Sequence, residues 1–143
     1  MDRICEIEAQ VRGSESLPEV LAAAFDAFEA IRAAARDCED RTPELFAAFL
    51  LAGGAATEGR NALLGAPSLP HGGGPRGGVV AAADVYGAAD ELAALAAALA
   101  ARMSAARSDT AAAEDRAACG NAASAAIEIH RLLARADDET TVR

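Results

Sequence analysis

The sequence contains no lysine and no tryptophan, and only 3% of its 143 residues are aromatic. All 13 basic side chains are arginines, a composition typical of bacterial genomes rich in G and C. The absence of lysine excludes a Schiff-base lysine, a pyridoxal phosphate lysine and the lysine of a P-loop. We therefore expect no cofactor held by these chemistries, and no other motif in the chain indicates one.

Basic charge and long apolar runs are also scarce. The 22 acidic residues outnumber the 13 basic ones and give a net charge of −9. Few positive side chains are therefore left to neutralise the phosphates of a nucleic-acid backbone. The longest apolar run, residues 45–56, has about a dozen residues, whereas a membrane span needs roughly 20. We expect a soluble protein that binds neither nucleic acid nor a membrane.

Cysteine is rare and its spacing carries no motif. The residues Cys5, Cys38 and Cys119 lie far apart, form no CxxC pair and are odd in number. The acidic, amphipathic N-terminus does not resemble a secretory signal. These features predict reduced thiols and a cytoplasmic location.

Alanine is abundant, with 41 residues, and it favours helices over strands. Apolar residues recur at spacings of three and four along several segments, which is the period of an amphipathic helix. A capping box of Ser16 and Glu19 and the pair Thr42–Pro43 mark two helix starts. The predicted fold is all-α, an antiparallel four-helix bundle with a short extra N-terminal helix, in a single domain over 1–143. The expected helices span about 2–12, 17–39, 43–64, 79–107 and 110–135, with a glycine-rich loop over 65–78.

Two tight turns and one long loop predict an up-down-up-down order for the four main helices. The alternative is a pair of helical hairpins that completes its bundle only by dimerising. Alanine-rich helices bury little apolar area each, and a second copy adds to it, so we expect a homodimer or other homo-oligomer.

The glycine-rich loop contains His71–Gly74 (HGGG) and Arg76. It lacks the lysine of a P-loop, and the chain lacks the serine elbow that accompanies an esterase oxyanion loop. We interpret it as a crossover between two hairpins. Arg76, just before the next predicted helix, is a candidate anion-binding residue because helix N-termini attract anions.

The chain has few side chains suited to binding a metal in a helical bundle, because it contains two histidines and no Glu-x-x-His pair. We predict no metal site. The mid-helix glycines Gly53 and Gly54 indicate close helix–helix contact, with a kink or a ligand approaching the backbone as alternatives.

His130 lies in the last predicted helix, within Glu128-Ile129-His130-Arg131. This segment is similar to the acidic–apolar–His pattern of sensor-kinase dimerisation helices, and the placement resembles histidine phosphotransfer domains. That resemblance implies a phosphoacceptor role for His130. Leu133 stands where the phosphotransfer pattern has lysine, and Arg131 stands where the kinase pattern has an acid.

Several polar residues interrupt the apolar helices: Glu58, Arg60, Asn61, Asp84, Tyr86, Asp90, Asn121 and Ser124. If they met inside the bundle, they would form a small-molecule pocket with acid–base groups. Glu58, Arg60, Tyr86 and Asp90 are the candidate catalytic residues of that alternative, whereas a solvated surface is the commoner arrangement.

No nucleophile–base pair or metal cluster is recognisable, so an enzymatic role is not favoured. The sequence favours an acidic helical bundle that acts through protein–protein contacts as a regulatory or accessory module. A ligand-binding or catalytic bundle is the first alternative, and histidine phosphotransfer is the distant one.

Overall fold

The computed structural model describes residues 3–70 and 84–141, and within these ranges the chain is helical and has no strand. The fold-class prediction is confirmed: a short N-terminal helix packs on a bundle of four longer antiparallel helices. The elements are α1 (Arg3–Gly13), α2 (Leu17–Glu39), the 3₁₀ turn η1 (Pro43–Leu45), α3 (Phe46–Leu64), α4 (Val85–Asp109) and α5 (Ala113–Thr141).

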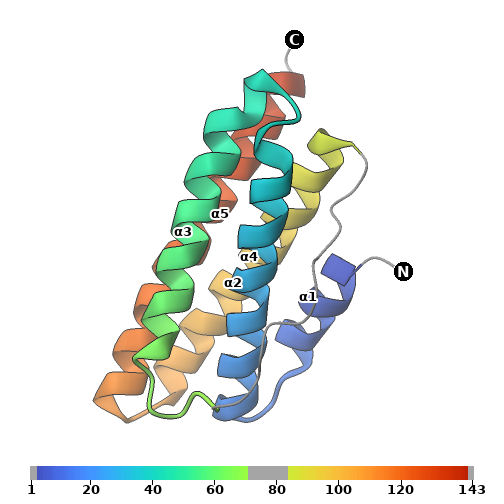
Figure 1. Cartoon of the computed structure of the whole chain (residues 1–143). Coiled ribbons are helices and arrows are strands. Elements are labelled where there is room, and N and C mark those ends of the chain that lie inside the picture. The colour runs from blue at the N-terminus through green and yellow to red at the C-terminus, as the bar shows by residue number, and fades with distance from the viewer. Residues whose placement is uncertain (1–2, 71–83, 142–143) are drawn as a thin grey trace.

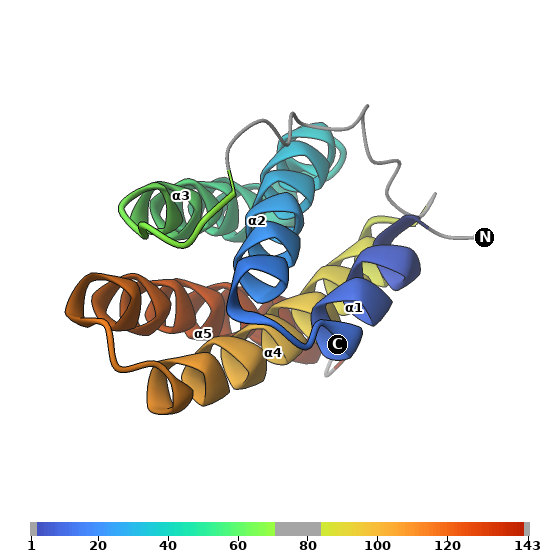
Figure 2. The ribbon, with the colours of Figure 1, turned by 90° about the horizontal axis from the view of Figure 1, so that it is seen from below.

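Each long helix packs against two others. The helix α2 contacts α3 and α4, and α5 contacts the same two helices from the opposite corner (Figure 2). The helix α1 contacts α2 and α4, on the side of the bundle away from α3 and α5. One outer side of the bundle is therefore covered by α1, and among the described residues no helix covers the side formed by α3 and α5.

The order of helix directions differs from the predicted up-down-up-down. In Figure 1, α2 rises, α3 and α4 both descend, and α5 rises again, so α3 and α4 are parallel and diagonal to each other. Among the four long helices every contacting pair is still antiparallel, whereas the short α1 runs parallel to α4. The sequence could not indicate this order, because the period of a helix shows which face is buried and not which helix covers it.

Side-chain caps mark two helix starts. Ser16 accepts a hydrogen bond from the Glu19 N–H at 3.4 Å, and its hydroxyl donates to Glu19 Oε1 at 2.8 Å, which closes the expected capping pair. Asp84 caps α4 by accepting from the N–H groups of Tyr86 and Gly87. The helix predicted from residue 79 thus begins at Val85, while residues 71–83 lie outside the described part.

Two other boundaries differ from the expected ones. The segment after Thr42 begins as the tight turn η1 before α3, in which the Leu45 N–H donates to the Thr42 carbonyl and the Phe46 N–H donates to the Pro43 carbonyl, each three residues back. The last helix begins at Ala113 rather than at 110, and it continues to Thr141 rather than ending near 135. No glycine or proline follows Arg135 to stop it.

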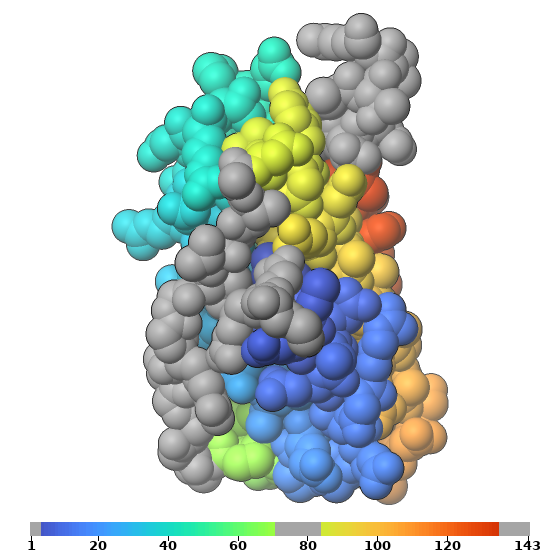
Figure 3. Space-filling view, turned by 90° about the vertical axis from the view of Figure 1, so that its right-hand side faces the viewer, coloured from blue at the N-terminus to red at the C-terminus, as the bar shows by residue number. Residues whose placement is uncertain are grey.

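The helix α1 closes one side of the core. It buries Ile4, Ile7 and Val11, which recur along one face of the helix. Figure 3 shows α1 and the beginning of α2 lying against α4. The core beneath consists of small alanines anchored by larger side chains, of which the following are less than 2% exposed: Leu21, Phe28, Ile31, Phe49, Leu63, Leu92, Leu95, Leu99, Met103, Ile129 and Leu133.

The glycine that permits close packing is Gly59, which the sequence did not single out. A Cβ built there would lie 2.5 Å from two ring atoms of the fully buried Phe28. At Gly53 a Cβ would make an ordinary 3.8 Å contact with Ala35, and at Gly54 it would meet nothing within 4 Å. The interpretation of Gly54 as a close contact within the chain is therefore wrong, because its position faces outward.

In the part of the chain that the structure describes, no helix is both long and apolar enough to cross a bilayer.

Candidate functional site

Arg60 belongs to an ion-pair network between α2 and α3. Its Nη1 donates to Glu29 Oε1 at 3.2 Å, and its guanidinium lies over the Phe25 ring, 5.8 Å from the centroid. Arg32 donates to the same Glu29 carboxylate. This network joins two helices, so Arg60 has a clear structural role.

Tyr86 lies in the first turn of α4 and has a partner different from that of Arg60. Its hydroxyl donates to Glu44 Oε2 at 3.1 Å, which ties the beginning of α4 to the turn η1. This hydrogen bond raises the pKa of Tyr86 above its ordinary 10.0, because the bond stabilises the protonated phenol. The raised pKa moves Tyr86 further from the range useful for acid–base catalysis near neutral pH.

Glu58 and Asp90 are both exposed, Glu58 on α3 and Asp90 on α4. These two helices are diagonal in the bundle and are not among its main contacting pairs. The four candidate catalytic residues thus have different surroundings. Arg60 belongs to the ion-pair network with Glu29, Tyr86 is bonded to Glu44, and the other two are exposed carboxylates. A shared catalytic pocket for these four residues stays a prediction.

His130 is exposed on α5 and faces α4. Its Nδ1 lies 3.1 Å from the carbonyl oxygen of Ala93, and since a carbonyl can only accept, Nδ1 is the protonated nitrogen. In the neutral ring Nε2 is then the free acceptor. The carboxylate of Glu128 is paired with Arg131 on the same helix. The phosphoacceptor role implied by the sequence resemblance stays a prediction.

The candidate anion site at Arg76 lies outside the described residues. Within the described ranges 3–70 and 84–141, no group of three His, Cys, Asp or Glu side chains is arranged to hold a metal ion.

The thiols divide into one exposed and two buried groups. Cys5 is exposed, whereas Cys38 and Cys119 are buried, and burial raises the pKa of both thiols above the ordinary 9.0.

We expect one thiol per chain to react rapidly with a disulfide reagent near pH ~8, because the reactive form is the exposed thiolate. Cys38 and Cys119 should react only on unfolding.

The two raised pKa values also predict that stability is retained below about pH 9 and falls above it, since the unfolded thiols ionise first. Thiol titration with and without guanidinium, and urea unfolding on both sides of that pH, measure the two effects. Equal reaction rates for all three thiols in the native protein would contradict the burial.

The outer face of α3 is apolar and exposed. Phe46, Leu50 and Leu51 are 41%, 49% and 56% exposed, and Leu64 continues the exposure near the end of the helix. Ala47 and Gly54, on the same outward side, are exposed as well. Residues 46–57 contain no charged side chain. A helix that is apolar around its whole circumference is normally covered on all sides, so this face indicates a contact surface.

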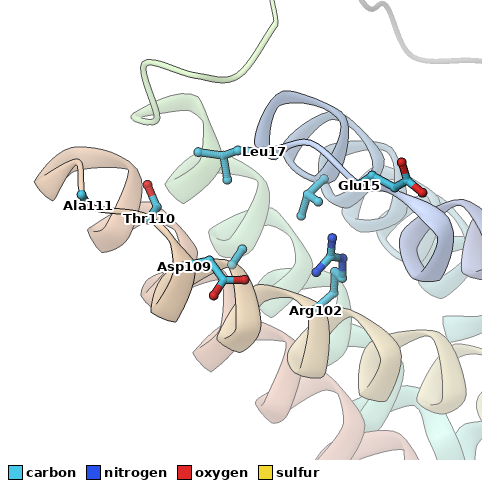
Figure 4. Close-up of a pocket in the computed structure, with 8 residues that line it drawn as sticks. Glu15, Leu17, Arg102, Asp109, Thr110 and Ala111 are labelled. Carbon is cyan, nitrogen blue, oxygen red and sulfur yellow. The ribbon is translucent and has the colours of Figure 1, made fainter.

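A small pocket lies where the α1–α2 connection meets the end of α4. It has a volume of about 190 Å³, and its walls come from the α1–α2 connection, the first turn of α2, the end of α4 and the turn into α5 (Figure 4). Arg102 points from α4 toward the α1–α2 connection, and Asp109 lies further along α4. The lining residues are Glu15, Leu17, Val20, Arg102, Ala106, Asp109, Thr110 and Ala111. The sequence did not single out this pocket, since Arg102 stands in a helix whose neighbours are not encoded locally.

Comparison with known proteins gave no relative: no family model matches the chain, and neither a curated protein nor a solved structure matches it significantly.

Proposed function

We propose that this protein is a non-enzymatic protein-binding module whose contact surface is the outer face of α3, and that a second copy of the chain occupies this face. The observation that carries the proposal is the exposure of Phe46, Leu50 and Leu51 on an uncharged stretch of helix. On the other side of the bundle, α1 covers the comparable groove between α2 and α4. The face of α3 has no such cover among the described residues.

The charge of the chain favours a contact at this face over contacts elsewhere. Two copies that each carry −9 repel each other over most of their surfaces. The stretch 46–57 is free of charge, so apolar burial there is not opposed by like charges at the centre of the contact.

The order of residues on α3 is also self-complementary. Leu50 and Leu51 are flanked at equal distances by the small residues Ala47 and Gly54. In an antiparallel pair of α3 helices with the two-fold axis between the leucines, Ala47 of each copy faces Gly54 of the other. Leu50 of each copy then faces Leu51 of the other at the centre of the contact, with the small residues on either side, and the same surface serves both copies, as a two-fold dimer requires. The open space above Gly54 leaves room for a close approach.

We place this module in the cytoplasm of a bacterium, as a regulatory or accessory protein. The free thiols of Cys5, Cys38 and Cys119 support a reducing compartment. The all-arginine composition supports a bacterial source.

The test is the oligomeric state of surface variants. We expect the wild-type protein to scatter light at twice the 14.4 kDa monomer mass at micromolar concentration. Leu51→Glu should shift it to the monomer, because the substitution places two like charges at the centre of the contact. The matched control is Ile127→Glu on α5, where the replaced side chain is similarly exposed at 54% and lies on another helix.

The outcomes separate the possibilities. A monomeric wild-type protein would overturn the self-association, and so would a dimer that Leu51→Glu leaves intact. Dissociation by both substitutions would indicate a general effect of added charge rather than a contact at α3.

A further inference from the structure

The guanidinium of Arg102 lies on α4, diagonally across the bundle from α3, and takes no part in the proposed contact surface. The side chain is half-buried, and its Nη2 donates to the carbonyl oxygen of Ser14 at 2.5 Å. Its Nε is fully buried and has no hydrogen-bond partner among the described residues. Two other described arginines, Arg32 and Arg60, are also half-buried, and the Nε of Arg60 is likewise buried without a hydrogen-bond partner among the described residues. Both of these arginines nevertheless pair with Glu29. Arg102 has no carboxylate within ion-pair distance in the described part of the chain.

A partly desolvated guanidinium with a single hydrogen bond is an incomplete arrangement. Arginine carries five N–H donors in a planar fork that matches a carboxylate, and burial makes an opposite charge more stabilising. The chain has 22 acidic residues, yet none of the described ones takes this position. The guanidinium therefore has capacity for a carboxylate supplied from outside.

The rest of the pocket specifies what that carboxylate belongs to. Leu17, Val20 and Ala106 provide an apolar wall, while Asp109 and Thr110 provide polar groups nearer the α4–α5 turn. A volume of about 190 Å³ suits a molecule a little larger than benzene, which occupies an engineered cavity of about 150 Å³. The ligand is thus small, with a short aliphatic part.

The charge of the site favours a zwitterion over a simple anion. Glu15 and Asp109 also line the pocket, and the whole chain is negative, so a free anion would meet repulsion on approach. An ammonium group on the same ligand cancels the net charge and gives Asp109 a partner. Thr110 has both a donor and an acceptor for the remaining polar atoms.

We infer that this pocket binds a small aliphatic α-amino acid, with the carboxylate on Arg102, the ammonium group on Asp109 and the side chain against Leu17, Val20 and Ala106. The site is separate from the proposed contact at α3, because its lining residues come from the α1–α2 connection, the first turn of α2, the end of α4 and the turn into α5, and none of them from α3.

The probe is L-valine, added to the isotope-labelled full-length chain and followed by NMR chemical shifts. We expect saturable shifts at the amides of Val20, Ala106 and Thr110 with a millimolar dissociation constant. Isovalerate, which lacks only the amino group, should bind at least about tenfold more weakly, because it has no ammonium group to pair with the Asp109 carboxylate. Absence of saturable shifts with L-valine would overturn the inference, and so would equal binding of the two compounds.

Two variants assign the charged contacts. Arg102→Gln should weaken valine binding by about tenfold or more, whereas Arg107→Gln, an exposed arginine on the same helix, should leave it unchanged. Asp109→Asn, which is isosteric and exposed, should weaken valine binding without weakening isovalerate. This second variant keeps the test valid if loss of the Arg102–Ser14 bond perturbs the fold. Unchanged valine affinity in Asp109→Asn would refute the role of the ammonium group, and in a folded Arg102→Gln it would refute the role of the guanidinium.

Discussion

Replacing Gly59 by alanine is expected to destabilise the protein by about 2–3 kcal/mol, although alanine is the better helix former by about 1 kcal/mol. The new methyl group would lie 2.5 Å from two ring atoms of Phe28, closer than real Cβ contacts come. Phe28 is fully buried among alanines and other core side chains, so its ring cannot turn away without displacing neighbours. For a chain of this size the midpoint of thermal unfolding should fall by on the order of 10 °C.

The matched control for Gly59→Ala is the same substitution at Gly54, five residues earlier on α3. A Cβ there meets nothing within 4 Å, so only the gain in helix propensity remains, and stability should rise by up to about 1 kcal/mol. Both variants are compared by urea unfolding in the Leu51→Glu background, which removes any contribution of the proposed dimer. Opposite signs at the two glycines are expected, and equal effects would refute the packing argument.

A second substitution locates the strain. Phe28→Leu removes the ring atoms that the new methyl group would touch, so Gly59→Ala should cost much less in that background. The coupling free energy in this double-mutant cycle is expected to exceed about 1 kcal/mol. Simple additivity of the two substitutions would show that the cost of Gly59→Ala has another origin.

The helices and their buried faces were largely predictable, because their signals are local. In α2 the residues Leu21, Phe28, Ile31 and Cys38 recur at helical spacing, and all are fully buried. The start of the same helix was predictable from Ser16, because a capping bond joins residues three apart. In the first three turns of α3 (residues 46–56) the same reasoning fails to choose a face, since apolar residues surround the helix there and no polar side defines the outside.

The ties between elements were not predictable, because they join residues far apart in sequence. Arg60 meets Glu29 across 31 positions, Tyr86 meets Glu44 across 42, and Arg102 meets the Ser14 carbonyl across 88. Each tie depends on the order in which the helices pack, which differs here from the simplest up-and-down arrangement. For this reason the sequence grouped Arg60 and Tyr86 as one candidate site and passed over Arg102.

The tie between the Asp115 carboxylate and Ser68, 47 positions apart in sequence, is expected to contribute strongly to stability. Asp115 is only 3% exposed at the start of α5, and its two oxygens accept hydrogen bonds from the Ser68 N–H at 3.1 Å and the Ser68 hydroxyl at 2.6 Å. Asp115→Ala removes both bonds and leaves a backbone donor without its partner. We expect a loss of about 3 kcal/mol in the free energy of unfolding, since bonds to charged groups contribute roughly 1.5–3 kcal/mol.

Two controls separate this tie from a simple charge effect at the beginning of α5. Glu114→Ala removes the adjacent exposed carboxylate and should cost no more than about 1 kcal/mol, the scale of a charge near a helix N-terminus. Ser68→Ala removes only the hydroxyl bond and should cost an intermediate amount. Asp115→Ala should in addition accelerate hydrogen exchange at the Ser68 amide under native conditions, because the segment after α3 then loses its attachment to α5. Equal losses for Asp115→Ala and Glu114→Ala, with unchanged exchange at Ser68, would mean that the carboxylate acts on the helix dipole and not as a tie between the two helical hairpins.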